Sequence, residues 1–111
     1  MKSRSVKGEI VQSSSGNVFA DLGLADAETL KIKTGLVIEI RKAIQARGLT
    51  QQEAGKRMGL TQPKVSGMMR GDFSNLSERK LMGCLIRLGF DIEIKIRPAK
   101  VDVGQLLLTV A

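Results

Sequence analysis

Residues 50–71 constrain the fold of this chain more than any other segment, because they carry the start and stop signals of two short, closely spaced helices. Thr50 and Thr61 stand where N-caps are expected, and Glu53 completes a capping box with Thr50. Only Gly59-Leu60 separates the two helices. Two capped helices joined by so short a glycine turn are typical of a helix-turn-helix, which places its second helix in the major groove of DNA.

The charge of the chain favours the same partner. It holds 18 basic and 11 acidic residues, a formal net charge of +7, which suits a polyanion. The excess gathers on the helix-turn-helix segment, where residues 47–80 contain seven basic and three acidic side chains, a local net of +4. These are Arg47, Lys56, Arg57, Lys64, Arg70, Arg79 and Lys80 against Glu53, Asp72 and Glu78. We therefore expect double-stranded DNA as the partner.

Composition argues against catalysis, metals and cofactors. The chain has no histidine, which is the commonest general base and metal ligand, and it has no glycine-rich phosphate loop. A Ser-Lys or carboxylate enzyme is the remaining option, but no nucleophile–base pair stands out. The single cysteine, Cys84, allows no intrachain disulfide, and we interpret it as a buried apolar residue rather than a reactive thiol. With neither a secretory signal nor a membrane span, we expect a cytoplasmic protein.

The chain divides into one domain with two tails. Residues 1–16 are polar and end in a serine-glycine run, so we expect a flexible tail, and residues 99–111 form a second tail. The domain spans 17–98. Its apolar opening, residues 17–24, is interpreted as a clasp over the helical core, with partner binding as the alternative.

Two longer helices are expected on either side of the pair. Asp26 can cap a helix that Gly48 ends, and Gly35 marks a kink or a break within it. Its apolar face comprises Leu30, Ile32, Leu36, Val37, Ile38, Ile40 and Ile44. Ser77 caps the last helix, whose stripe of Leu81, Cys84, Leu85 and Leu88 precedes the stop at Gly89.

Residues 90–97 follow a period of two, which predicts a strand with one apolar face. Ile92, Ile94 and Ile96 alternate with charged residues, and Pro98 closes the run. A lone strand leaves its backbone groups unpaired and therefore needs a partner. We favour the same strand of a second subunit, giving a two-fold homodimer with dimerisation through these isoleucines. A hairpin formed with residues 101–110 is the alternative.

The second helix of the pair offers side chains suited to base edges. Gln62 can bond bidentately to adenine, and Lys64 can reach guanine or a phosphate. Ser66 is short and polar, and Gly67 leaves space for close approach to DNA. Against this stands the simpler interpretation, in which polar residues on a short helix form a solvated face. The pair of matched, capped helices favours the DNA interpretation.

Further residues of the helix pair are expected to bind DNA phosphates and so fix the position of the protein along the duplex. Gln51 begins the first helix, where the helix dipole favours an anion. Arg57 and Arg70, together with Lys80, are expected phosphate contacts, and Thr61 completes the set of DNA-binding residues. Arg79 and Arg87 are interpreted as ordinary surface charges.

Five stretches of the chain resemble a known family. The stretches beginning at Thr50, Gly59 and Arg70 are similar to the Xre/Cro-type helix-turn-helix family, and residues 17–24 and 88–98 resemble its HigA-like antitoxin branch. The resemblance implies a mainly α, five-helix Cro/lambda-repressor-like domain with one C-terminal strand. It also implies a dimeric repressor of its own operon that neutralises a RelE-like ribonuclease toxin. In the family, the positions of Gln62, Lys64 and Ser66 approach bases, while Pro63 departs from the polar reader that relatives carry.

Two other functions remain open. A stand-alone or phage-type Xre-family regulator would bind an operator in the same way without a toxin partner, and the neighbouring reading frame would distinguish it. An interaction module would use the helix pair to bind protein or RNA, and salt-dependent, sequence-specific binding to DNA would argue against that.

Overall fold

The computed structural model describes residues 26–111, and four α-helices make up the regular secondary structure of this part. They are α1 (Asp26–Ala46), α2 (Gln51–Met58), α3 (Gln62–Met69) and α4 (Glu78–Arg87). The expected tail 1–16, the segment 17–24 and the side chain of Asp26 lie outside what is described. Within residues 26–111 no helix is long and apolar enough to cross a membrane.

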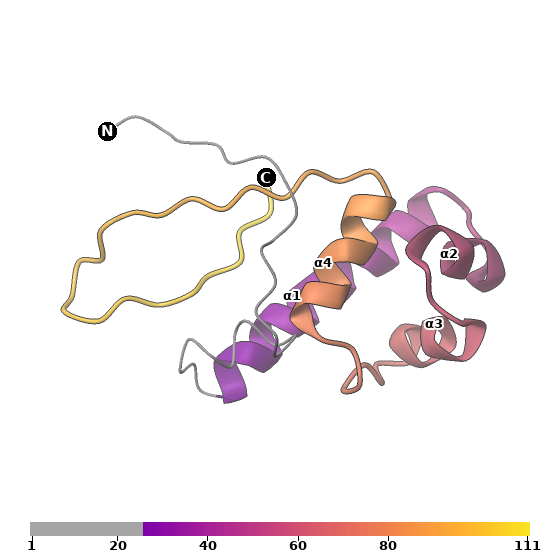
Figure 1. Cartoon of the computed structure of the whole chain (residues 1–111), viewed down its shortest axis with the longest axis horizontal. Helices are drawn as coiled ribbons and strands as arrows, with labels where there is room; N and C mark the ends of the chain where they lie inside the picture. The colour runs from indigo at the N-terminus through magenta and orange to yellow at the C-terminus, as the bar shows by residue number, and fades with distance from the viewer. Residues whose placement is uncertain (1–25) are drawn as a thin grey trace.

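The helices enclose one apolar core. α1 packs along α4, and α2 packs against both α3 and α4, so the short pair sits at one end of the longer two (Figure 1). Every helix contributes fully buried side chains, among them Ile40, Met58, Met68 and Leu81, and Leu88 is buried just after α4. Because each helix buries one face in a shared core, the α2–α3 pair is held rigidly on the α1–α4 platform.

The start and stop signals act at the residues where the sequence places them. The Thr50 hydroxyl accepts the Glu53 N–H at 3.1 Å, and the Glu53 carboxylate accepts the Thr50 N–H at 3.0 Å, which is the expected capping box. Gly59 ends α2 with a φ of 71°, a left-handed conformation that glycine adopts without strain. Ser77 caps α4 by accepting the Lys80 N–H at 3.1 Å.

Thr61 departs from the expected cap. It occupies the N-cap position of α3 with extended backbone angles, but its side chain makes no capping hydrogen bond. Pro63 is the second residue of the helix and has no N–H, so one of the two donors that a cap normally serves is missing. The start of α3 therefore depends on proline's fixed φ and leaves the Thr61 hydroxyl out of the cap.

Five helices were expected, and residues 26–111 contain four. The expected break at Gly35 was wrong, since α1 runs through Gly35 without interruption. Glycine costs about 1 kcal/mol in a helix, which the burial of Ile32, Leu36 and Val37 on either side outweighs. Gly35 instead admits a distant side chain, because a methyl group there would lie 2.6 Å from Cδ2 of Leu108. Leu30 and Ile38, expected to face the core, are exposed.

The expected C-terminal strand is absent from residues 26–111. The chain leaves α4, runs out, bends near residues 100–103 and returns, and we call residues 90–111 the arm (Figure 1). No backbone–backbone hydrogen bond is formed within the arm beyond the one from the Phe90 N–H to Leu85 O. A period of two gives a chain the side-chain pattern of a strand, but a ladder requires a second strand in register. The arm therefore stays extended and unpaired.

We predict that Gly55→Val destabilises the fold by about 2–3 kcal/mol, because it forces apart a close contact between α2 and the turn. A methyl group on Gly55 would lie 2.7 Å from the Leu60 carbonyl oxygen, which is backbone and cannot swing away. Denaturant unfolding measures the change. Gly83→Ala is the control, since a methyl there meets no atom within 4 Å and should stabilise α4 by up to about 1 kcal/mol. Equal stability of both variants would contradict the contact.

We predict that Gly35→Ala displaces the returning end of the arm without harming the helices. The added methyl stabilises α1 by about 1 kcal/mol but occupies the place of Leu108. The methyl NMR signals of Leu106 and Leu108 should then move toward their unfolded positions, while the thermal transition of the helices stays or rises. Unmoved leucine signals would show that the arm is not seated at Gly35.

Candidate nucleic-acid interface

α3 has one buried and one exposed side, which fits a helix that faces a partner outside the domain. Val65 and Met68 are completely buried. Gln62, Pro63 and Lys64 are exposed at its first turn. Two of the expected base-reading residues, Gln62 and Lys64, therefore lie together at the exposed N-terminal end of this helix.

The N-terminal end of α2 is where the sequence predicts a phosphate contact. Gln51 is its first residue and is partly exposed, and the capping box uses Glu53 and Thr50 next to it. Hydrogen bonds from the backbone N–H and hydroxyl of Thr50 lower the pKa of Glu53, with a smaller effect from Arg57. Glu53 therefore stays ionised at neutral pH, and Gln51 is the side chain free to meet a phosphate oxygen.

Ser66 and Arg70 act on each other. The Arg70 guanidinium donates a hydrogen bond to the Ser66 hydroxyl across one turn at the end of α3. Arg70 is exposed and Ser66 is partly buried. This bond holds Arg70 beside α3, where its remaining N–H groups can reach a phosphate. It also occupies the Ser66 hydroxyl, which the sequence predicted to approach the bases.

Gly67 lies on the inner side of α3, unlike the other expected DNA-binding residues. It is buried, its carbonyl accepts the Asp72 N–H at 2.8 Å, and a methyl on it would lie 3.1 Å from the Asp72 carbonyl oxygen. The space left by the missing side chain is therefore filled by the loop after α3. Gly67 therefore allows the loop after α3 to pack against the helix, and it does not provide space for DNA on the exposed face.

Among residues 26–111, no carboxylate forms an ion pair with the cations of this region. The ion pairs formed among residues 26–111 are Lys42–Glu39 at 3.4 Å and Lys95–Glu93 at 3.8 Å, both away from α2, α3 and α4. The exposed basic side chains on these three helices and their loops are Lys56, Arg57, Lys64, Arg70, Lys80 and Arg87. Their positive field is therefore available to an external anion, and it is strongest at short range because salt screens it over about 10 Å.

The three isoleucines expected at the dimer contact lie in the arm. Ile92 is partly buried against the core, whereas Ile94 and Ile96 are 73% and 90% exposed. Val101 and Val103 extend this exposed apolar surface. The arm therefore carries apolar side chains and unpaired backbone on the outside of the domain, as expected of a surface that a partner covers.

Two arginines have defined places: Arg87, which the sequence left as a surface charge, and Arg47, which it counted only among the basic residues of the segment. A methyl on Gly59 would collide with the Arg87 guanidinium, and one on Gly89 would lie 2.8 Å from Nη2 of Arg47. Arg87 thus covers the C-terminal end of α2, and Arg47 covers that of α4, where a cation stabilises the helix dipole. The spacing of Lys80, Gly83 and Arg87 places them on one face of a helix. The sequence could therefore have indicated that Arg87 shares a surface with Lys80.

Cys84 is buried, as expected, and lies on the core side of α4. Burial raises the pKa of its thiol, with smaller opposing effects from Lys80 and Arg87. The thiol is therefore protonated at neutral pH and packs as a small apolar side chain.

Comparison with known proteins places this arrangement in a family. Residues 18–97 match a family model described as a helix-turn-helix domain. A solved structure described as "Putative XRE Family Transcriptional Regulator" is similar, with a TM-score of 0.70 and 31% sequence identity. The match covers 78% of this chain and 98% of that one. No curated protein matches the chain.

Proposed function

This chain belongs to the XRE-type helix-turn-helix family, and we propose that it is a sequence-specific, DNA-binding transcriptional regulator. The observation that carries the proposal is the exposed N-terminal end of α3 with Gln62 and Lys64, on a set of helices whose cations form no ion pair among residues 26–111. Direct reading of sequence in the major groove requires polar side chains on a rigid helix, surrounded by charge that holds the DNA backbone.

In the proposed complex, α3 lies in the major groove with its first turn toward the base edges. Gln62 bonds to adenine, and Lys64 reaches guanine or a nearby phosphate. Gln51, at the start of α2, and Thr61, whose hydroxyl is not used as a cap, bond phosphate oxygens on the flanking strand. Arg57 and Arg70 add charge contacts that fix the register.

We also propose a specific cellular role for this regulator. The chain acts in the cytoplasm as a homodimeric repressor of its own operon and as the antitoxin of a toxin–antitoxin pair, with a RelE-like ribonuclease as its toxin. The similarity of residues 88–98 to HigA-like antitoxins and the exposed apolar arm support this assignment. A stand-alone regulator lacks the toxin. Co-purification with the product of the adjacent reading frame decides between them, since a stand-alone regulator would retain no such protein.

The binding function itself is tested on the DNA upstream of the gene for this chain, against an unrelated duplex of equal length. We expect tighter binding to the upstream DNA, with an affinity that falls steeply as salt rises, by a slope of about 0.9 per phosphate neutralised. Equal affinity for the two duplexes would favour the interaction module, which binds protein or RNA, over the regulator. We propose a binding protein and not an enzyme, so no turnover should accompany binding.

We predict that Gln62→Ala relaxes the base preference at one step of the operator by about 1–3 kcal/mol. The helix start is preserved, because Pro63 still follows. Binding to a set of single-base operator variants measures the preference. Gln45→Ala, at an exposed position on α1, removes the same amide elsewhere and should leave the profile unchanged. An unaltered profile for Gln62→Ala would refute the reading role.

We predict that Ile94→Lys shifts the protein from dimer to monomer, because a charge replaces an apolar contact between two arms. Sedimentation measures the mass. The matched control is Leu30→Lys, which places the same charge on an exposed apolar residue of α1, outside the arm. If both variants keep the wild-type mass, dimerisation lies on another surface.

A further inference from the structure

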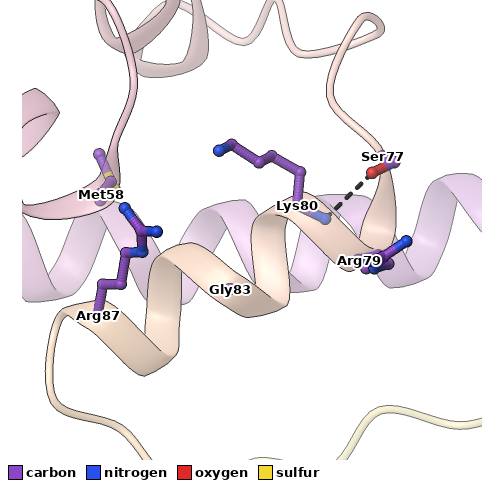
Figure 2. Close-up of a pocket in the computed structure, with 6 residues that line it drawn as sticks. All are labelled: Met58, Ser77, Arg79, Lys80, Gly83 and Arg87. Carbon is purple, nitrogen blue, oxygen red and sulfur yellow. Dashed lines mark hydrogen bonds between the residues drawn. The ribbon is translucent and has the colours of Figure 1, made fainter. Parts of the chain in front are cut away.

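A basic cleft of about 280 Å³ lies between the end of α2 and one side of α4 (Figure 2). It is lined by Met58, Ser77, Arg79, Lys80, Gly83 and Arg87, and we call it the α4 cleft. None of these residues belongs to α3, so the cleft is distinct from the base-reading surface proposed above. Its volume is near the lower end of the range for small-molecule sites.

The α4 cleft gathers positive charge, and among residues 26–111 the negative group that its cations face is the C-terminal end of α2, which Arg87 covers. Three of its six lining residues are cations, and none is a carboxylate. No described carboxylate forms an ion pair with any of the three. Glu78, in the first turn of α4, is 2% exposed and is not among the lining residues. Three like charges around one hollow repel one another, and an anion bound between them would relieve that repulsion.

The geometry leaves room for such an anion. Lys80 and Arg87 are two helical turns apart on α4, about 10 Å along the axis, and their side chains rise on the side where Met58 lies (Figure 2). Gly83 stands between them, and a methyl group built on it meets no atom within 4 Å. The missing side chain therefore keeps the space between the two cations open. Arg87 is held in place, because its guanidinium rests against Gly59.

We propose that the α4 cleft binds a phosphate group, with Lys80 and Arg87 as its charged donors and Arg79 at its rim. Arg87 supplies several N–H donors in a plane, and Lys80 supplies a compact charge, a pairing suited to phosphate oxygens. The phosphate has two sources of the same chemistry: a small phosphorylated ligand that regulates the protein, or the DNA backbone beside the operator.

Two variants test the cleft by different means. Gly83→Leu fills the hollow and keeps every cation, and it should fold well because leucine is a better helix former than glycine. Arg87→Gln removes one charge and keeps the hollow. Thr34→Leu and Arg41→Gln are the matched controls, the first a gain of side-chain bulk and the second the same charge loss, both at exposed positions of α1.

The first measurement is calorimetric titration of inorganic pyrophosphate into the full-length protein without DNA. If the source is a small ligand, we expect binding to the wild type and a loss of about tenfold or more in Gly83→Leu and Arg87→Gln, with little change in the controls. This measurement does not depend on DNA recognition, so it stands even if the proposed regulator function fails.

The second measurement is the salt dependence of duplex binding. If the source is the DNA backbone, pyrophosphate binds no better to wild type than to Arg87→Gln, but Arg87→Gln lowers the salt slope by about 0.9 and Arg41→Gln does not. Either result supports the phosphate site and shows whether the phosphate comes from a small ligand or from the DNA backbone. The proposal is overturned if pyrophosphate binding and salt slope are the same in wild type and both cleft variants, or if Arg41→Gln changes them as much as Arg87→Gln.

Discussion

The contact between Gly55 and the backbone of Leu60 governs the rest of this structure. The Leu60 N–H donates to the Gly55 carbonyl at 2.9 Å, and the Leu60 carbonyl lies so close to Gly55 that no side chain fits between them. The turn after α2 is therefore pressed onto the helix that precedes it. This sets the direction in which α3 leaves the turn, so the side that carries Gln62 and Lys64 faces outward while Val65 and Met68 enter the core.

The exposure of the basic residues follows from this geometry. The pair of short helices buries its apolar side chains on the α1–α4 platform, so its basic residues must lie outside. Within the described part of the chain no carboxylate pairs with them, and an arginine covers the C-terminal end of α2 and another that of α4. The unbalanced charge weakens the isolated domain slightly through self-repulsion, and an anionic partner removes that cost.

Much of the helical part could be predicted from the sequence, because its signals are local. The capping box at Thr50, the left-handed glycine after α2 and the Ser77 cap each depend on residues within one helical turn. The arm could not be predicted in this way. Its alternation is a local pattern, but a ladder depends on a second strand that local sequence does not specify, and residues 90–97 remain unpaired in the single chain.

Gly35 shows the same division at one residue. A glycine in the middle of a helix predicts a break from local sequence, yet burial on both sides of it keeps α1 continuous. The returning arm packs Leu108 against this glycine. The sequence by itself determined where α2, α3 and α4 begin and end, which side chains α3 offers, and where positive charge accumulates, since these depend on neighbours in the chain. Tertiary structure alone decided that Gly67 faces the loop, that Gly35 receives Leu108, and that Lys80 and Arg87 border one hollow with Met58. Those arrangements arise from packing between segments far apart in the sequence, which no local pattern encodes.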